Sequence, residues 1–136
     1  MASPTDHHAR IVVVDDEKLL GWAIGMLLSK AGYEVVTFQD PRLALTEMLQ
    51  SVPDLVVSDV VMPGLSGIDL AIQLQRQQPG IKTLLLSGQA NTLKLLDNAR
   101  AQGFDFEVYP KPIAPQELLR LIAARLDLSR QQVAAA

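Results

Sequence analysis

Five short apolar runs alternate with five helix-length amphipathic segments along the chain, and this alternation limits the fold more than any other feature. The predicted strands cover residues 10–14, 33–38, 54–58, 81–86 and 106–109. The predicted helices cover about 17–31, 41–50, 67–78, 92–102 and 115–128. Strands that alternate with helices favour a parallel sheet with helices on both faces. Because five strands are too few for a closed eight-stranded barrel, we predict an α/β fold, a (βα)5 doubly wound five-stranded parallel sheet in a three-layer sandwich.

Capping and turn residues support these element boundaries. Asp40 followed by Pro41 is typical of a helix start, because the carboxylate caps free amides and proline suits the first helical position. Ser66, with Asp69 three residues later, resembles a capping box. Gly32 is a typical residue just after a helix end. The segments between the apolar runs are therefore separate helices with short connections.

Composition limits the classes of protein that fit. The chain has 136 residues, 49% hydrophobic and 20% charged, with a net charge of −3 and no cysteine. One soluble domain is expected, without disulfides or thiolate metal sites, and nucleic-acid binding is disfavoured because no basic patch is present. No apolar run reaches the ~18–20 residues of a membrane span, and the N-terminus lacks a signal-peptide core, so a cytoplasmic location is predicted. We expect a flexible tail over 1–9, one domain over 10–128, and a tail or the start of a linker over 129–136.

Polar residues follow four of the five predicted strands. In open α/β sheets, sites form beyond the carboxyl ends of the strands, so these residues should meet at one rim. The first and third strands are expected to be neighbours, which brings three carboxylates into one pocket. The residues that follow the strands are Asp15, Asp16 and Glu17, then Ser58 and Asp59, then Ser87, then Lys111.

The residue types at this rim indicate phosphoryl chemistry. Asp15, Asp16 and Asp59 repel one another when ionised and need a cation. His7 and His8 fall in the predicted tail, so only oxygen ligands are available, and these suit Mg²⁺. A lysine and a hydroxyl beside the metal suit an anion, and aspartate is a known phosphoryl-accepting nucleophile. Singly, the same residues could be helix caps, turn residues or a surface lysine; together they predict that Asp59 accepts a phosphoryl group.

Four motifs carry a resemblance to a known family. The segments IVVVDDE, LVVSDVVMPGLSG, LLLSG and KPI occur in this order over residues 10–128. The sequence here resembles the CheY-like receiver domain of two-component response regulators, which has a flavodoxin-like fold. The resemblance implies a phosphoprotein that takes a phosphoryl group from a sensor histidine kinase or a histidine phosphotransfer protein. It also implies a Mg²⁺-dependent reaction and a conformational switch that regulates an output or partner.

The resemblance also assigns roles to the acidic residues. Asp59 matches the phosphoacceptor and a metal ligand. Asp16 matches a direct metal ligand, and Asp15 matches an acid that acts on the metal through water. The backbone carbonyl of Val61 matches the third metal ligand.

Other matched positions include one departure from the family. Lys111 matches the lysine that pairs with phosphate, Ser87 the hydroxyl that follows the phosphoryl group, and Pro112 a proline usually preceded by a cis bond. Three residues before the lysine, the family often has an aromatic residue that couples to the hydroxyl, but here it is Val108. Strand alternation puts the neighbouring Tyr109 on the other face of the sheet. The usual aromatic switch is therefore not expected.

Two other classes of function remain open from the sequence. A metal-dependent phosphohydrolase would carry a second aspartate two residues after the nucleophile, where this chain has Val61. A phosphorylation-independent adaptor would keep the fold without the chemistry, which the complete residue set disfavours. A receiver would phosphorylate and dephosphorylate itself without turning over a separate substrate, so we do not expect an ordinary enzyme.

Two surfaces could bind partners. Leu19, Trp22 and Met26 lie opposite the core stripe of the first helix, as single exposed residues or as a docking patch for the kinase or phosphotransfer protein. Leu121 and Leu128 of the last helix could form a homodimer seam.

Neither direct nucleic-acid binding nor membrane binding is expected. The sequence leaves open the input signal, the output, and whether the chain is a stand-alone receiver or part of a longer regulator.

Overall fold

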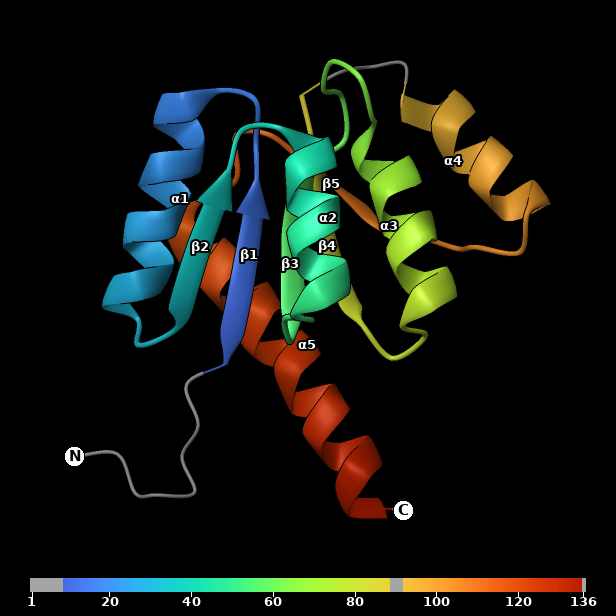
Figure 1. The fold of residues 1–136 in the computed structure, drawn as a ribbon. Coiled ribbons are helices and arrows are strands. Elements are labelled where there is room, and N and C mark those ends of the chain that lie inside the picture. Colours follow the sequence, from blue (N-terminus) through green and yellow to red (C-terminus); the bar gives the residue numbers. More distant parts are fainter. Residues whose placement is uncertain (1–8, 89–91, 136) are drawn as a thin grey trace.

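The computed structural model describes residues 9–88 and 92–135, with side chains up to residue 127. Over these residues, five strands and five helices alternate (Figure 1). The strands are β1 (Arg10–Val14), β2 (Glu34–Phe38), β3 (Leu55–Asp59), β4 (Lys82–Ser87) and β5 (Val108–Pro110). The helices are α1 (Lys18–Lys30), α2 (Pro41–Gln50), α3 (Gly67–Gln77), α4 (Thr92–Ala101) and α5 (Pro115–Ala135).

The strands form one parallel sheet in the order β2-β1-β3-β4-β5. Helices α1 and α5 cover one face, and α2, α3 and α4 cover the other (Figure 1). The predicted doubly wound α/β sandwich is thereby confirmed. The order places β1 beside β3, which brings the carboxyl ends of these two strands together.

The wholly apolar runs exist because the central strands are buried on both faces. Ile11 and Val13 of β1 belong to the hydrophobic cluster under α1 and α5. Val12 and Val14 alternate with them and belong to the cluster under α2 and α3. A strand between two helical layers has no solvent-facing side, so it shows no polar alternation.

The capping signals act as the sequence predicts. The Asp40 carboxylate accepts a hydrogen bond from the Arg42 amide at 2.9 Å, which caps α2. The Ser66 hydroxyl accepts one from the Asp69 amide at 3.0 Å, which caps α3. Gly32 has a φ of 101°, a left-handed conformation that favours glycine after a helix.

The C-terminal part of the chain differs from the sequence expectation. β5 begins at Val108, because Phe106 packs into the cluster beside α3 and α4 instead of continuing a strand. α5 continues past residue 128 to Ala135. Leu121 was the wrong residue for a possible dimer seam, since it is only 9% exposed and belongs to the domain core. A homodimer through the last helices stays a prediction. The side chain of Leu128 lies outside the described side chains.

Two further expectations concern the N-terminus and membranes. His7 and His8 lie outside the described residues. Within residues 9–88 and 92–135, none of the helices has both the length and the apolar character that crossing a membrane requires.

Candidate functional site

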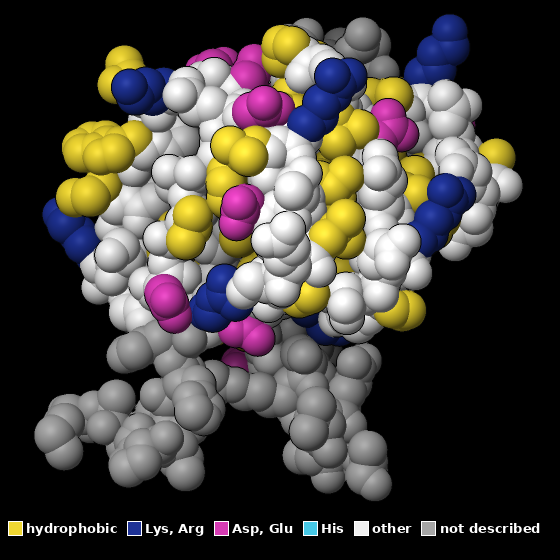
Figure 2. All heavy atoms as spheres, viewed as in Figure 1, with side chains coloured by type: hydrophobic (Ala, Val, Ile, Leu, Met, Phe, Trp, Pro, Cys, Tyr) yellow, Lys and Arg dark blue, Asp and Glu magenta, His cyan; other side chains and the backbone are white. Residues whose placement is uncertain are grey.

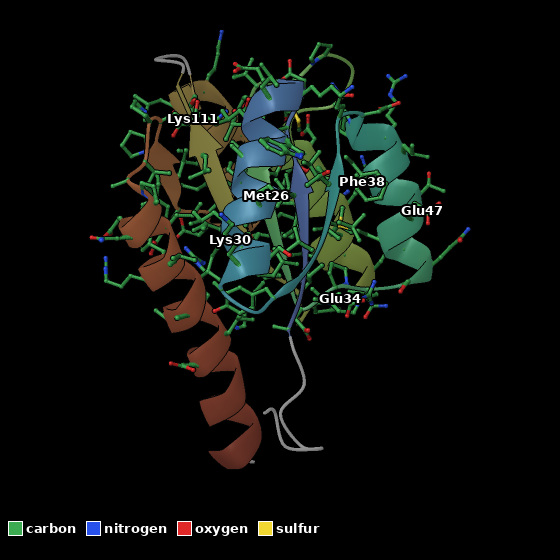
Figure 3. All side chains as sticks on the ribbon, turned by 90° about the vertical axis from the view of Figure 1, so that its left-hand side faces the viewer. Met26, Lys30, Glu34, Phe38, Glu47 and Lys111 are labelled. Atoms are coloured by element: carbon green, nitrogen blue, oxygen red, sulfur yellow. The ribbon has the colours of Figure 1, made fainter. Side chains whose placement is uncertain are left out.

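The carboxyl ends of β1, β3 and β5 meet at one rim of the sheet. Asp15 directly follows β1, Asp59 is the last residue of β3, and Lys111 directly follows β5. Lys111 lies at the upper end of the sheet in Figure 3, where the strands end. Three segments that are far apart in the sequence therefore supply one site, as the sequence pattern predicts.

Lys111 forms ion pairs with two buried aspartates. Its Nζ lies 3.0 Å from Oδ2 of Asp15 and 3.2 Å from Oδ2 of Asp59. Asp15 and Asp59 are 2% and 8% exposed. The other oxygen of Asp15, Oδ1, accepts a hydrogen bond from the Glu17 amide at 2.9 Å. Each buried carboxylate is thus held by a cation or an amide, which offsets the cost of removing its charge from water.

Burial and charge act in opposite directions on these groups. Burial raises the pKa of Asp59 above its ordinary value; Lys111 lowers it, and Asp15 and Asp16 add to the rise. For Lys111, burial lowers the pKa, but the hydrogen bonds and charges of Asp15 and Asp59 outweigh it and raise the pKa overall. Lys111 therefore stays protonated, and ionised Asp59 is held in a setting that favours added positive charge.

The acidic residues fit a divalent cation. One oxygen from each of Asp15, Asp16 and Asp59 lies within 4.8 Å of the other two. Three carboxylates without imidazole or thiolate ligands suit a hard cation such as Mg²⁺. Asp16 is exposed, so the group opens to solvent on one side. The adjoining pocket is lined by Asp16, Glu17, Asp59, Val61, Met62, Pro63, Gly88 and Lys111.

The backbone around Asp59 is fixed by a close approach of α3. The Gly67 amide donates to the carbonyl of Val60 at 2.8 Å. The Ser58 hydroxyl, 1% exposed, donates to the carbonyl of Asp59 at 2.9 Å. A Cβ at position 67 would lie 2.1 Å from that same carbonyl oxygen, so only glycine fits. Gly67 is the last residue of the motif LVVSDVVMPGLSG, but nothing in the sequence marks a glycine at a helix start as a contact with a distant strand, so its role becomes evident only in the structure.

Ser87 lies at the rim, but its side chain belongs to a different contact. Its Oγ lies 2.7 Å from Oγ1 of Thr92, the first residue of α4. Among the described residues, Gly88 lines the pocket at this strand end and Ser87 does not. The backbone carbonyl of Ser87 accepts a hydrogen bond from the Lys111 amide at 3.0 Å, which joins the two strand ends. Nothing in the sequence marks Thr92, the first residue of the predicted fourth helix, as a partner of Ser87.

The residues before Lys111 match the expected departure from the aromatic pattern. Val108 packs into the cluster beside α3 and α4, whereas Tyr109 packs into the cluster under α1 and α5. The Tyr109 hydroxyl donates to Glu107 at 2.6 Å. The Lys111–Pro112 bond is cis, as the family resemblance implies.

The outer face of α1 carries exposed apolar side chains. Leu19, Trp22 and Met26 are 81%, 60% and 42% exposed. Met26 lies on the outward side of α1 in Figure 3, and Figure 2 shows hydrophobic side chains at the left-hand edge, where α1 lies in Figure 1. This patch follows Glu17 in the chain, so it begins next to the acidic rim.

A doubly wound sheet whose rim joins three aspartates and a lysine is the architecture of a phosphoryl-accepting signalling module. The chain belongs to the response regulator receiver domain family, whose model matches residues 11–123. Receiver domains are signalling domains that take a phosphoryl group from histidine kinases and use Mg²⁺. The expected family, fold and general function are therefore confirmed.

Known proteins with this domain differ in overall length. The DNA-binding response regulator MtrA of Mycolicibacterium smegmatis is 30% identical over 125 residues, which are 92% of this chain and 54% of MtrA. The C4-dicarboxylate transport transcriptional regulatory protein DctD of Pseudomonas aeruginosa is 30% identical over 128 residues, or 94% of this chain and 27% of DctD. The chain thus spans about half of one relative and about a quarter of the other.

A solved structure covers the same extent as this chain. The CheY-like response regulator receiver domain protein from Methanospirillum hungatei JF-1 has a TM-score of 0.84 and 25% identity. The match covers 93% of this chain and 99% of that one.

Proposed function

We propose that Asp59 accepts a phosphoryl group from a phosphohistidine on a sensor histidine kinase or a histidine phosphotransfer protein. The observation that carries this proposal is the pairing of the Asp59 carboxylate with Lys111 at 3.2 Å, in a pocket shared with Asp16. An ionised nucleophile beside a fixed cation suits attack on a phosphoryl group, because charge on the phosphoryl oxygens is neutralised as they arrive.

The transfer is an in-line displacement. An oxygen of Asp59 bonds to phosphorus while the P–N bond of the phosphohistidine breaks. The electron pair of that bond stays on the imidazole nitrogen, which takes a proton from solvent. Lys111 remains protonated and pairs with a phosphoryl oxygen, so it exchanges part of its contact with Asp59 for the new group.

The residues proposed to hold Mg²⁺ are Asp16 and Asp59 directly, with the backbone carbonyl of Val61, and Asp15 through water. The carboxylate cluster within 4.8 Å supports this assignment. When bound, Mg²⁺ would supply positive charge that offsets the oxygens of the transferring group.

The phosphoryl group adds up to two negative charges at the rim. Ser87 and Lys111 then move toward it, and the face formed by α4, β5 and α5 shifts between two populations. The domain modifies and dephosphorylates itself and turns over no separate substrate. MtrA and DctD are named as DNA-binding and transcriptional regulators; regulation of an output or partner by this chain is a proposal. The cytoplasmic location remains a prediction.

The exposed patch Leu19, Trp22 and Met26 is the proposed docking surface for the phosphohistidine partner. Trp22 is a large aromatic side chain, 60% exposed, on the helix whose start follows the rim residues Asp16 and Glu17, and such a side chain suits an interface anchor. A partner seated there would bring its histidine close to Asp59.

Intact mass spectrometry after incubation with acetyl phosphate and Mg²⁺ tests the proposal. We expect an added mass of one phosphoryl group, absent without Mg²⁺ and absent in Asp59→Asn. An unmodified protein, with both acetyl phosphate and its kinase, would instead support an adaptor. Sustained hydrolysis of a phosphomonoester would support a phosphohydrolase, which Val61 at the second position after Asp59 disfavours.

A further inference from the structure

The Ser87 hydroxyl is joined to α4 by a buried hydrogen bond. Ser87 Oγ and Thr92 Oγ1 lie 2.7 Å apart, and the two residues are 6% and 7% exposed. Ser87 ends β4 and Thr92 begins α4, so this contact links the sheet rim to a helix N-terminus. At that distance and burial the two hydroxyls share one well-formed hydrogen bond.

The direction of β4 explains why Ser87 faces α4. Side chains alternate along a strand, and Leu84 and Leu86 lie in the cluster under α1 and α5. Leu85 lies in the opposite cluster, which contains Leu96 of α4, and Ser87 follows Leu85 with the same orientation. A Ser87 hydroxyl that binds a phosphoryl group on Asp59 must therefore turn away from Thr92.

We infer that Thr92 is a positioning residue that holds the Ser87 hydroxyl in its resting orientation, and that loss of the Ser87–Thr92 hydrogen bond carries the phosphorylation signal to the N-terminus of α4. This inference rests on the proposed phosphorylation of Asp59. It adds that α4 is the first helix whose contacts change after phosphorylation. The Val108 side chain is aliphatic and cannot hydrogen-bond to Ser87, whereas the Thr92 hydroxyl of α4 makes a polar contact with it.

The two partners of Ser87 compete. The Ser87 side chain adopts one rotamer at a time, so turning its Oγ toward the phosphoryl group removes Oγ from Thr92, whichever hydroxyl donates. One neutral hydrogen bond shifts a two-state equilibrium by about fivefold. Removing the Thr92 hydroxyl should therefore favour the phosphoryl-bound orientation by about that factor.

The test uses beryllofluoride with Mg²⁺ as a phosphoryl mimic, and its apparent dissociation constant is measured by titration with amide NMR. Thr92→Val keeps the shape of the side chain and removes the hydroxyl, and it should bind beryllofluoride about fivefold more tightly than wild type. Thr92→Ser keeps a hydroxyl and should resemble wild type. In a Ser87→Ala background, Thr92→Val should have no further effect.

Several results would overturn the inference. One is unchanged or weaker binding of beryllofluoride in Thr92→Val. Another is an equal gain in beryllofluoride affinity when Thr92→Val is added to Ser87→Ala, because Thr92 would then have a structural role independent of Ser87. If wild type binds beryllofluoride and Thr92→Val does not tighten it, only this inference fails. If wild type binds none and Asp59 is not phosphorylated, the proposed function fails as well.

Hydrogen exchange on the wild-type chain gives a readout that needs no variant. Beryllofluoride should speed exchange of the amides of residues 96–99, which donate to the carbonyls of the first turn of α4, because the contact that anchors this turn is lost. Exchange that stays unchanged or slows at these amides would contradict the inference.

Discussion

Replacing Gly67 with alanine should displace the backbone that carries Asp59. The new Cβ would lie 2.1 Å from the Asp59 carbonyl oxygen, 2.9 Å from its carbonyl carbon and 2.9 Å from Ser58 Oγ. Side-chain Cβ atoms essentially never come closer than 3.0 Å to such atoms, so α3 and β3 must separate by about 1 Å. Overpacking of this kind costs about 1–3 kcal/mol. Two of the three atoms belong to backbone that cannot rotate away, so we expect about 3 kcal/mol.

Urea unfolding followed by circular dichroism measures this loss directly. A loss of about 3 kcal/mol corresponds to a decrease in Tm of about 10 °C for a domain of this size. Phosphorylation by acetyl phosphate, measured below the lowered Tm, should slow by up to about 100-fold, because a misplacement near 1 Å at a reacting group has that effect.

Gly80→Ala is the matched control. No atom lies within 4 Å of a Cβ at position 80, and its φ is not in the left-handed region. Its stability should change by less than about 0.5 kcal/mol. If Gly67→Ala and Gly80→Ala give the same stability and the same phosphorylation rate, the close approach of α3 does not position Asp59.

Three further predictions concern the rim and α1. Burial raises the pKa of Asp59, so the ionised carboxylate destabilises the fold, and Asp59→Asn should raise the free energy of unfolding at pH 7. This gain should vanish as the pH falls below 3.8, where Asp59 is protonated in both the folded and the unfolded state. An equal gain at both pH values in urea titrations would contradict this prediction. Mg²⁺ at 100 times its dissociation constant should stabilise wild type by about 2.7 kcal/mol in thermal melts. Asp16→Asn should lose most of this stabilisation, whereas the control variant Asp105→Asn, at an exposed position, should keep all of it. Trp22→Ala should change the free energy of unfolding by less than about 0.5 kcal/mol and leave phosphorylation by acetyl phosphate intact, because Trp22 is exposed. The same variant should slow phosphoryl transfer from the kinase, and an unchanged transfer rate would contradict the docking role.

The fold could be predicted because its strongest signals are local. Apolar runs such as residues 10–14 and capping residues such as Asp40 and Ser66 act within a few positions of the sequence. The common rim followed from topology alone, since carboxyl ends of parallel strands share one edge. Asp15, Asp59 and Lys111 could therefore be grouped before any distance was known.

The missed features depend on packing between distant elements. Gly67 matters because of how closely α3 approaches β3, and no pattern around residue 67 encodes that distance. The orientation of Ser87 toward Thr92 depends on a side-chain rotamer. Leu121 was a possible seam residue because α5 is apolar on more than one face, and only its position over the sheet shows that this residue is in the core.

The ion pair between Lys111 and Asp15 joins residues 96 positions apart. Contacts of such long sequence separation form late, because loop closure must precede them. A chain still on the ribosome without residues 108–111 would hold its acids with no counter-charge and could not complete this pocket. A copy in which β5 has not yet joined the sheet therefore lacks the cation that faces Asp59. We expect such a copy to accept no phosphoryl group.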